Sequence, residues 1–120
     1  MRYIFHLFAD EAAFAARPPE ELQASFEAYM AYTQALKDAG VYIGGERLRP
    51  VGEATQVRVD AGGKTAVLDG PYAESKEQLA GYYMIDTPNL DEAIKWAARC
   101  PGATHGTVEV RAVWEQPVRA

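Results

Sequence analysis

The sequence predicts a small α+β protein with a single domain over residues 1–120. Its length of 120 residues is close to the usual size of one domain. Six segments have the short, β-branched or aromatic character of strands, and two carry helix signals. Two helices of this length cover only one face of a sheet, so the pattern favours a sheet with helices on one side.

A strand and a long helix open the chain. Residues 2–8 are aromatic and β-branched, which predicts a strand. Pro18 and Pro19 mark a helix start, because proline is tolerated in the first helical turn. Apolar residues then recur at spacings of three and four, and Gly40 stands where a left-handed C-cap belongs. We therefore expect a helix over residues 18–39.

The middle of the chain is predicted to hold strands and a hairpin. The glycine pair at 62–63 separates two β-prone segments, which indicates a hairpin. The segment DGPY at 69–72 breaks the chain into a turn. Strands are predicted at residues 41–49, 55–60, 64–68 and 79–86.

The last third predicts a second helix and a final strand. Asn89 can cap the helix, and Glu92 three residues later completes a pair like a capping box. Pro101 and Gly102 end it, and residues 107–115 alternate as a strand does. The predicted order is therefore β-α-β, a hairpin, then β-α-β.

The strongest strands have apolar side chains on both faces. An antiparallel sheet with one face in water shows polar residues on that face, and these strands do not. We therefore expect a second copy of the chain to cover the face that the helices leave open, in a homodimer. The alternating sets are Tyr3, Phe5 and Leu7 against Ile4, His6 and Phe8, and Tyr83 and Ile85 against Tyr82 and Met84.

Composition excludes several classes of partner. The formal net charge is −5, which repels phosphate backbones and anionic lipid, so we expect no nucleic acid and no membrane as partners. One cysteine permits no internal disulfide and fits a reducing compartment. No apolar segment approaches the length of a membrane span, and an acidic pair interrupts the N-terminal apolar run. We expect a cytoplasmic protein.

The densest group of polar and aromatic residues is the segment 69–83. Asp69, Tyr72 and Glu74 are the candidate catalytic residues. A carboxylate beside a turn can act as a general base, or it can accept backbone N–H groups and fix the turn, and both alternatives stay open. Tyr82 and Tyr83 are candidate hydrogen-bond donors to a substrate.

The remaining candidates lie in strands. His6 can bind a substrate, although a lone strand histidine is more often a hydrogen-bonded core or interface residue. Glu109 and Arg111 share one face of the last strand, and Arg111 can point to a pocket or a dimer rim. Glu46 in the second strand is a similar candidate. The alternative for Glu46, Glu109 and Arg111 is that they are paired charges on the protein surface. The candidate substrate-binding residues are His6, Glu46, Tyr82, Tyr83 and Arg111.

No metal or cofactor is predicted. The second histidine, His105, falls in a loop, and no spacing of histidine, cysteine and acids forms a ligand set. Cys100 ends a predicted helix, where a thiolate is not favoured, so we expect it to be a packing residue. Flavin and nucleotide fingerprints are missing from the sequence.

At DGPYAESKEQLAGYYMID the sequence resembles the YCII-related superfamily, in its DGPF-motif branch. The likeness extends over nearly the whole chain, through MRYIFHLFADE, AGVYIGGERLRP, LDEAIKWAARCPGA and GTVEVRAV. It implies a ferredoxin-like βαββαβ fold with an extra β-hairpin. It also implies that two sheets face each other across a central cavity, as a dimeric α/β barrel.

The resemblance leaves two functions open. Relatives resemble dimeric α/β-barrel enzymes, including small monooxygenases and isomerases, and a histidine–aspartate pair marks an active-site cleft in some of them. One hypothesis is that the chain binds or converts a small organic molecule in the dimer cavity. The other is a non-catalytic regulatory or ligand-sensing module linked to extracytoplasmic-function sigma factors. The sequence does not decide whether the protein is an enzyme.

Overall fold

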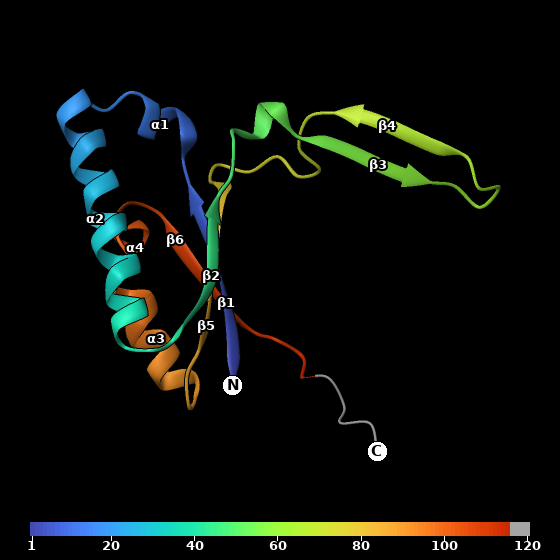
Figure 1. Cartoon of the computed structure of the whole chain (residues 1–120). Helices are drawn as coiled ribbons and strands as arrows, with labels where there is room; N and C mark the ends of the chain where they lie inside the picture. Colours follow the sequence, from blue (N-terminus) through green and yellow to red (C-terminus); the bar gives the residue numbers. More distant parts are fainter. Residues whose placement is uncertain (116–120) are drawn as a thin grey trace, which may run out of the picture.

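The computed structural model describes residues 1–115 (Figure 1). It contains a four-stranded antiparallel sheet, a separate two-stranded hairpin, and helices packed on one side of the larger sheet. In chain order the elements are β1 Arg2–Ala9, α1 Glu11–Ala15, α2 Pro19–Asp38, β2 Tyr42–Arg47, the 3-10 turn η1 Val51–Glu53, β3 Thr55–Val59, β4 Thr65–Asp69, β5 Gln78–Asp86, α3 Leu90–Arg99, α4 Gly102–His105 and β6 Thr107–Ala112.

The strand order of the larger sheet is β2-β5-β1-β6, and neighbouring strands are antiparallel. The connection from β1 through α2 to β2 joins two strands that lie on either side of β5. The connection from β5 through α3 to β6 leaves room for β1. These two interleaved units are the split β-α-β arrangement of the ferredoxin-like fold, and they confirm the predicted fold class.

The predicted elements agree with the observed ones at most boundaries. The helix expected over 18–39 is α2, and Gly40 after it has φ 72°, as the left-handed C-cap requires. The Asn89 side chain accepts a hydrogen bond from the Glu92 backbone N–H at 3.0 Å, which confirms the predicted cap. The last strand is shorter than predicted and ends at Ala112. Three short helical turns, α1, η1 and α4, were not predicted.

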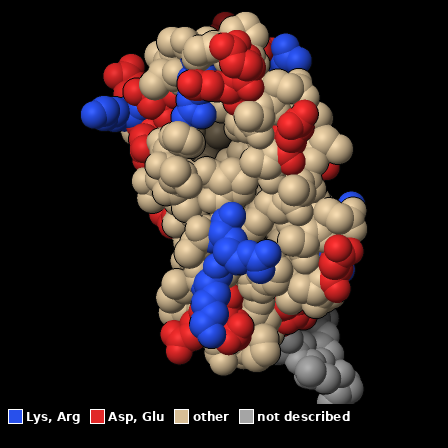
Figure 2. All heavy atoms as spheres, turned by 90° about the vertical axis from the view of Figure 1, so that its left-hand side faces the viewer, with Lys and Arg blue, Asp and Glu red and all other residues tan. Residues whose placement is uncertain are grey.

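The hydrophobic core lies between the sheet and the helices. β1 and β5 supply Phe5 and Ile85, α2 supplies Leu36, and all three are fully buried. Cys100 is also buried, in agreement with the packing role predicted for it, and burial raises the pKa of its thiol. The outer side of the helix layer carries charges of both signs with broad uncharged areas between them (Figure 2).

Partly buried hydroxyl groups fix the long helix to α3 and to the sheet. Tyr32 on α2 donates to the backbone carbonyl of Trp96 at 2.7 Å. The Thr33 and Tyr83 hydroxyls are hydrogen-bonded at 2.7 Å. Each such bond contributes on the order of 1 kcal/mol net, and a larger cost follows when one partner is left unpaired. These hydrogen bonds therefore contribute more to the position of α2 than to the free energy of unfolding.

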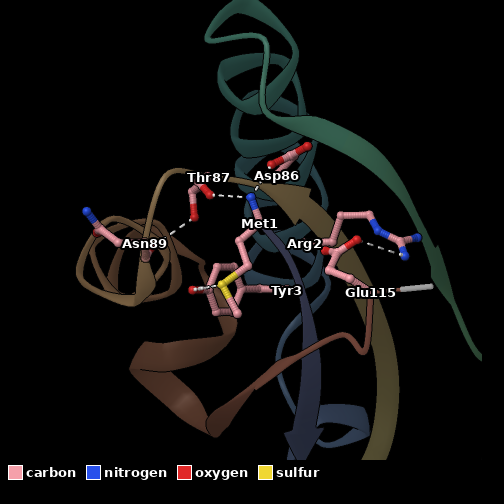
Figure 3. A network of polar contacts seen from close by, with 7 residues as sticks. All are labelled: Met1, Arg2, Tyr3, Asp86, Thr87, Asn89 and Glu115. Carbon is pink, nitrogen blue, oxygen red and sulfur yellow. Dashed lines mark hydrogen bonds and ion pairs between the residues drawn. The ribbon is translucent and has the colours of Figure 1, made fainter. Parts of the chain in front are cut away.

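The start of β1 is tied to the end of β5 by a polar network (Figure 3). The Met1 amino group lies 2.8 Å from the Asp86 carboxylate and 2.9 Å from the Thr87 carbonyl oxygen. The buried Thr87 hydroxyl donates to the Asn89 carbonyl at 3.1 Å. Arg2 and Glu115 approach to 3.8 Å. Because the charged pairs are exposed, each contributes about 0–1 kcal/mol.

The β3–β4 hairpin projects away from the sheet on the side opposite α2 and α3 (Figure 1). Asp60 shapes its turn by accepting the backbone N–H groups of Gly62 and Lys64 at 2.9 and 2.8 Å. Gly63 in this turn has φ 80°, a conformation that favours glycine. In the described part of the chain, no helix is long and apolar enough to span a membrane.

Candidate functional site

One row of polar side chains crosses the face of the sheet that the helices leave uncovered. Four residues stand directly opposite one another in neighbouring strands, and directly opposite residues point to the same face. Their sequence neighbours Phe5 and Tyr83 are buried on the helix side, so the row faces away from the helices. The row is Glu46, Tyr82, His6 and Glu109, from β2, β5, β1 and β6.

His6 and Glu109 form a hydrogen-bonded pair in this row. The distance between His6 Nδ1 and Glu109 Oε1 is 2.9 Å. A carboxylate can only accept, so the imidazole donates its Nδ1–H, and the neutral form of the ring has its lone pair on Nε2. The His6 side chain is 24% exposed, which leaves it reachable from outside. A neutral imidazole oriented by a carboxylate is an arrangement suited to general acid–base chemistry.

Apolar side chains surround the pair. Ile4 and Met84 stand opposite each other in the adjacent row, and Arg111 lies opposite Ile4 in the same row. Phe8, two residues along β1, meets the His6 ring edge-on with 6.4 Å between ring centroids. The apolar side chains Ile4, Met84 and Phe8 suit contact with the carbon skeleton of a small molecule.

An open groove adjoins the pair at the β6 side of the face. Its lining includes one cation, Lys76, as well as Glu109. Glu77 Oε1 accepts a hydrogen bond from the Thr107 hydroxyl at 2.8 Å, which fixes the loop before β5 to β6. The groove is lined by Phe8, Ser75, Lys76, Glu77, Thr107 and Glu109.

Gln78 holds the loop that carries Lys76. Its side-chain N–H donates to the Ser75 carbonyl at 2.7 Å, and its side-chain oxygen accepts the Glu11 N–H at 3.0 Å. Glu11 in turn accepts the Val51 N–H at 3.1 Å. The loop is therefore anchored to α1 and to the sheet, and Gln78 positions Lys76 beside the groove.

The predicted catalytic residues lie elsewhere, at the base of the hairpin and in the following loop. Asp69 is the last residue of β4 and pairs with Thr55. Tyr72 is 82% exposed and lines a second, shallow groove with β3 and Gly70. Glu74 is exposed in the loop. The structure does not bring these three residues into the row that holds His6.

Gln56 and Gly70 account for the shape of the turn after β4. The Gln56 side chain donates to the carbonyl oxygens of Gly70 and Pro71 at 3.1 and 2.8 Å. Gly70 has φ 104°, where a side chain would be strained. These contacts show that Gln56 holds the turn; whether the carboxylate of Asp69 acts as a base or as a turn residue stays a prediction.

The predicted substrate-binding residues divide between the two faces. His6, Glu46 and Tyr82 share the polar row, and Arg111 lies on the same face one row away. Tyr83 lies on the helix side, where its hydroxyl bonds Thr33. Burial raises the pKa of Tyr83. It belongs to the core and not to the open face.

Sequence reasoning missed Glu109 as the partner of His6. The alternation of the last strand put Glu109 and Arg111 on one face, and the observed strand order places that strand beside β1. What the sequence lacks is the register, because a shift of two residues would exchange Arg111 for Glu109 opposite His6. Within the described residues, no group of three histidine, cysteine or acidic side chains forms a metal site.

The fold and the open face define a ferredoxin-like α+β domain with an exposed polar row. Residues 1–117 match the model of the YCII-related domain, and the chain belongs to that family. An uncharacterised protein of Rhizobium meliloti (strain 1021) is 37% identical over 113 residues, which cover 92% of this chain and 90% of that protein. The predicted family is thereby confirmed, while assignment to the DGPF branch stays a prediction.

A solved structure with a similar fold is an enzyme. It is the 5-chloro-2-hydroxyhydroquinone dehydrochlorinase of Burkholderia phenoliruptrix AC1100, in complex with 2,5-dihydroxybenzoquinone. The TM-score is 0.55 with 14% sequence identity, over 98% of this chain and 96% of that one. At this identity the likeness shows a shared fold.

Proposed function

We propose that this protein binds a small organic molecule on the open sheet face and converts it by proton transfer. The observation that carries the proposal is the hydrogen bond between His6 and Glu109, with the free Nε2 of His6 on a face flanked by apolar side chains. The fold-level neighbour, a dehydrochlorinase of a chlorinated hydroxyhydroquinone, supports small-molecule chemistry on such a scaffold.

The pair sets the direction of the proposed proton transfer. Nε2 of His6 takes a proton from an acidic C–H or O–H of the substrate, and Glu109 stabilises the imidazolium that forms. His6 then returns the proton to another atom of the substrate, so the net reaction is an isomerisation that needs no oxidant or reductant. A positioned acid–base group of this kind contributes about 10²–10⁴ in rate.

Charged and polar neighbours supply binding. Lys76 in the groove offsets negative charge that develops on the substrate, and Arg111 holds an anionic group at the other side of the pair. Tyr82, next to His6 in the row, donates a hydrogen bond to a substrate oxygen, and Glu46 closes the row at β2. These roles suit a substrate with an ionisable hydroxyl or a carbonyl group.

We also propose that a second copy of the chain covers the open face, so that the site lies in a chamber within a homodimer. Ile4, Phe8 and Met84 on that face support this assembly, because a surface rich in apolar side chains is more stable when covered. Exclusion of water strengthens the interactions of the pair. The acidic charge and single cysteine support a cytoplasmic location.

Solvent-deuterium exchange monitored by NMR tests the chemistry. Phenols and compounds with an acidic C–H beside a carbonyl are incubated in D₂O with the wild type, with His6→Gln and with His105→Gln. We expect catalysed exchange with the wild type and with His105→Gln, and a loss of about 10²-fold or more with His6→Gln. Exchange that is unchanged in His6→Gln would refute the proposed base.

The same panel separates catalysis from sensing. Ligands that bind only the folded protein raise its melting temperature by mass action. A compound that raises the melting temperature without exchange or product would favour the ligand-sensing module of the sigma-factor hypothesis.

A further inference from the structure

The β3–β4 hairpin exposes an apolar surface outside the hydrophobic core. Val57 and Val67 stand directly opposite each other, and Val59 lies two residues along on the same face. These valines are 61–65% exposed, and the core cluster includes none of them. Leu68 on the other face is 63% exposed. A two-stranded hairpin alone is only marginally stable in water, so packing of this surface against a partner would stabilise it.

The chain is more extended than its length predicts. Its radius of gyration is 17.0 Å, whereas a compact domain of this size has about 14 Å. The β3–β4 hairpin stands away from the rest of the molecule and contributes to this extension (Figure 1). A segment that leaves the body of its own domain can reach a neighbouring one.

The base of the hairpin fixes its direction. The Gly70 N–H donates to the Ala54 carbonyl at 2.7 Å, and the Gln56 side chain bonds two carbonyl groups of the following turn. The hairpin therefore leaves the sheet on the side toward which the uncovered face looks (Figure 1). A second copy placed on that face would lie beside the hairpin.

We infer that the hairpin is a dimerisation arm, and that the face formed by Val57, Val59 and Val67 packs on a second copy of this chain. The inference rests on the homodimer of the proposed function and names the element that stabilises it. With strands about 4.8 Å apart and six to nine residues long, the open sheet face spans about 19 by 20–30 Å, a projected area of roughly 400–600 Å² per copy. A standard interface buries about 800 Å² per partner, so the arm supplies area that the sheet lacks.

Sedimentation velocity tests the arm. In the double variant with Val57→Lys and Val67→Lys, two charges replace side chains that are exposed in the single chain, so the fold should survive in circular dichroism. In a dimer they are buried, and we expect the dissociation constant to rise about a hundredfold or more. The matched control is Ala66→Lys, on the opposite face of β4, which should remain as dimeric as the wild type.

The outcomes separate the arm from the rest of the proposal. A dimeric wild type with a dimeric double variant would overturn the arm and leave the sheet-to-sheet dimer in place. Dissociation by Ala66→Lys to the same extent would overturn the assignment to the valine face. A monomeric wild type would overturn the assembly as a whole. A wild type that is dimeric but catalyses no deuterium exchange would refute only the acid–base chemistry.

Discussion

The imidazole of His6 and the carboxylate of Glu109 meet across the β1–β6 pairing, with 2.9 Å between Nδ1 and Oε1. The two residues are distant in sequence and are joined only by the strand register. Because the pair lies on the side of the sheet opposite the helices, its second ring nitrogen is available to a ligand. This relationship is the basis of the function proposed for the open face.

Removal of the carboxylate should impair the pair without breaking the fold. We expect Glu109→Gln to lower the rate of catalysed deuterium exchange by about 10–10²-fold, because the amide no longer stabilises the imidazolium. The change in the free energy of unfolding should stay below about 1 kcal/mol, since the pair is partly exposed. Glu53→Gln, at another exposed ion pair, is the control and should keep full activity.

Lys76 should act on substrate binding and on the developing charge. We expect Lys76→Ala to weaken the binding of an anionic substrate analogue by about tenfold, measured by isothermal titration calorimetry. Lys95→Ala changes the same kind of side chain on the exposed face of α3, where it pairs with Glu92, and should bind as the wild type does. Equal affinities for the two variants would exclude Lys76 from the site.

Adjacent glycines in β2 provide a test of the packing beneath the site. A Cβ on Gly45 would lie 2.8 Å from the Tyr82 carbonyl oxygen and 2.8 Å from a ring carbon of Tyr83, whereas a Cβ on Gly44 meets nothing within 4 Å. We expect Gly45→Ala to reduce the free energy of unfolding by about 1–3 kcal/mol in urea denaturation. Gly44→Ala should be neutral or slightly stabilising. The opposite order would contradict the register of β2 on β5.

The sequence was sufficient for the fold because local signals and topology agreed. Pro18 and Pro19 with Gly40 bounded α2, Asn89 capped α3, and alternation marked the strands. The site was harder to predict, because the pairing of His6 with Glu109 depends on the register of β1 against β6. The hydrophobic pattern does not determine this register, because β1 carries apolar side chains on both of its faces. The segment 69–83 predicted a role for Asp69. In the structure, the side chains that hold this segment in place are those of Gln56, Glu77 and Gln78.

The buried tyrosines predict how stability depends on pH. Burial raises the pKa of Tyr83, Tyr29 and Tyr32 above their ordinary value near 10, and that of the Cys100 thiol above its value near 9. The folded protein therefore keeps protons that the unfolded chain releases.

This contribution to stability is complete below about pH 9 and is lost as the pH rises through the folded-state values. We expect the free energy of unfolding, from urea titrations at each pH, to fall progressively above pH 9 for this reason. Tyr83→Phe should cost about 1 kcal/mol near neutrality, through loss of the bond to Thr33, and should make the alkaline decline shallower because one ionising group is gone. A decline as steep as that of the wild type would show that Tyr83 ionises as readily in the folded protein as in the unfolded chain.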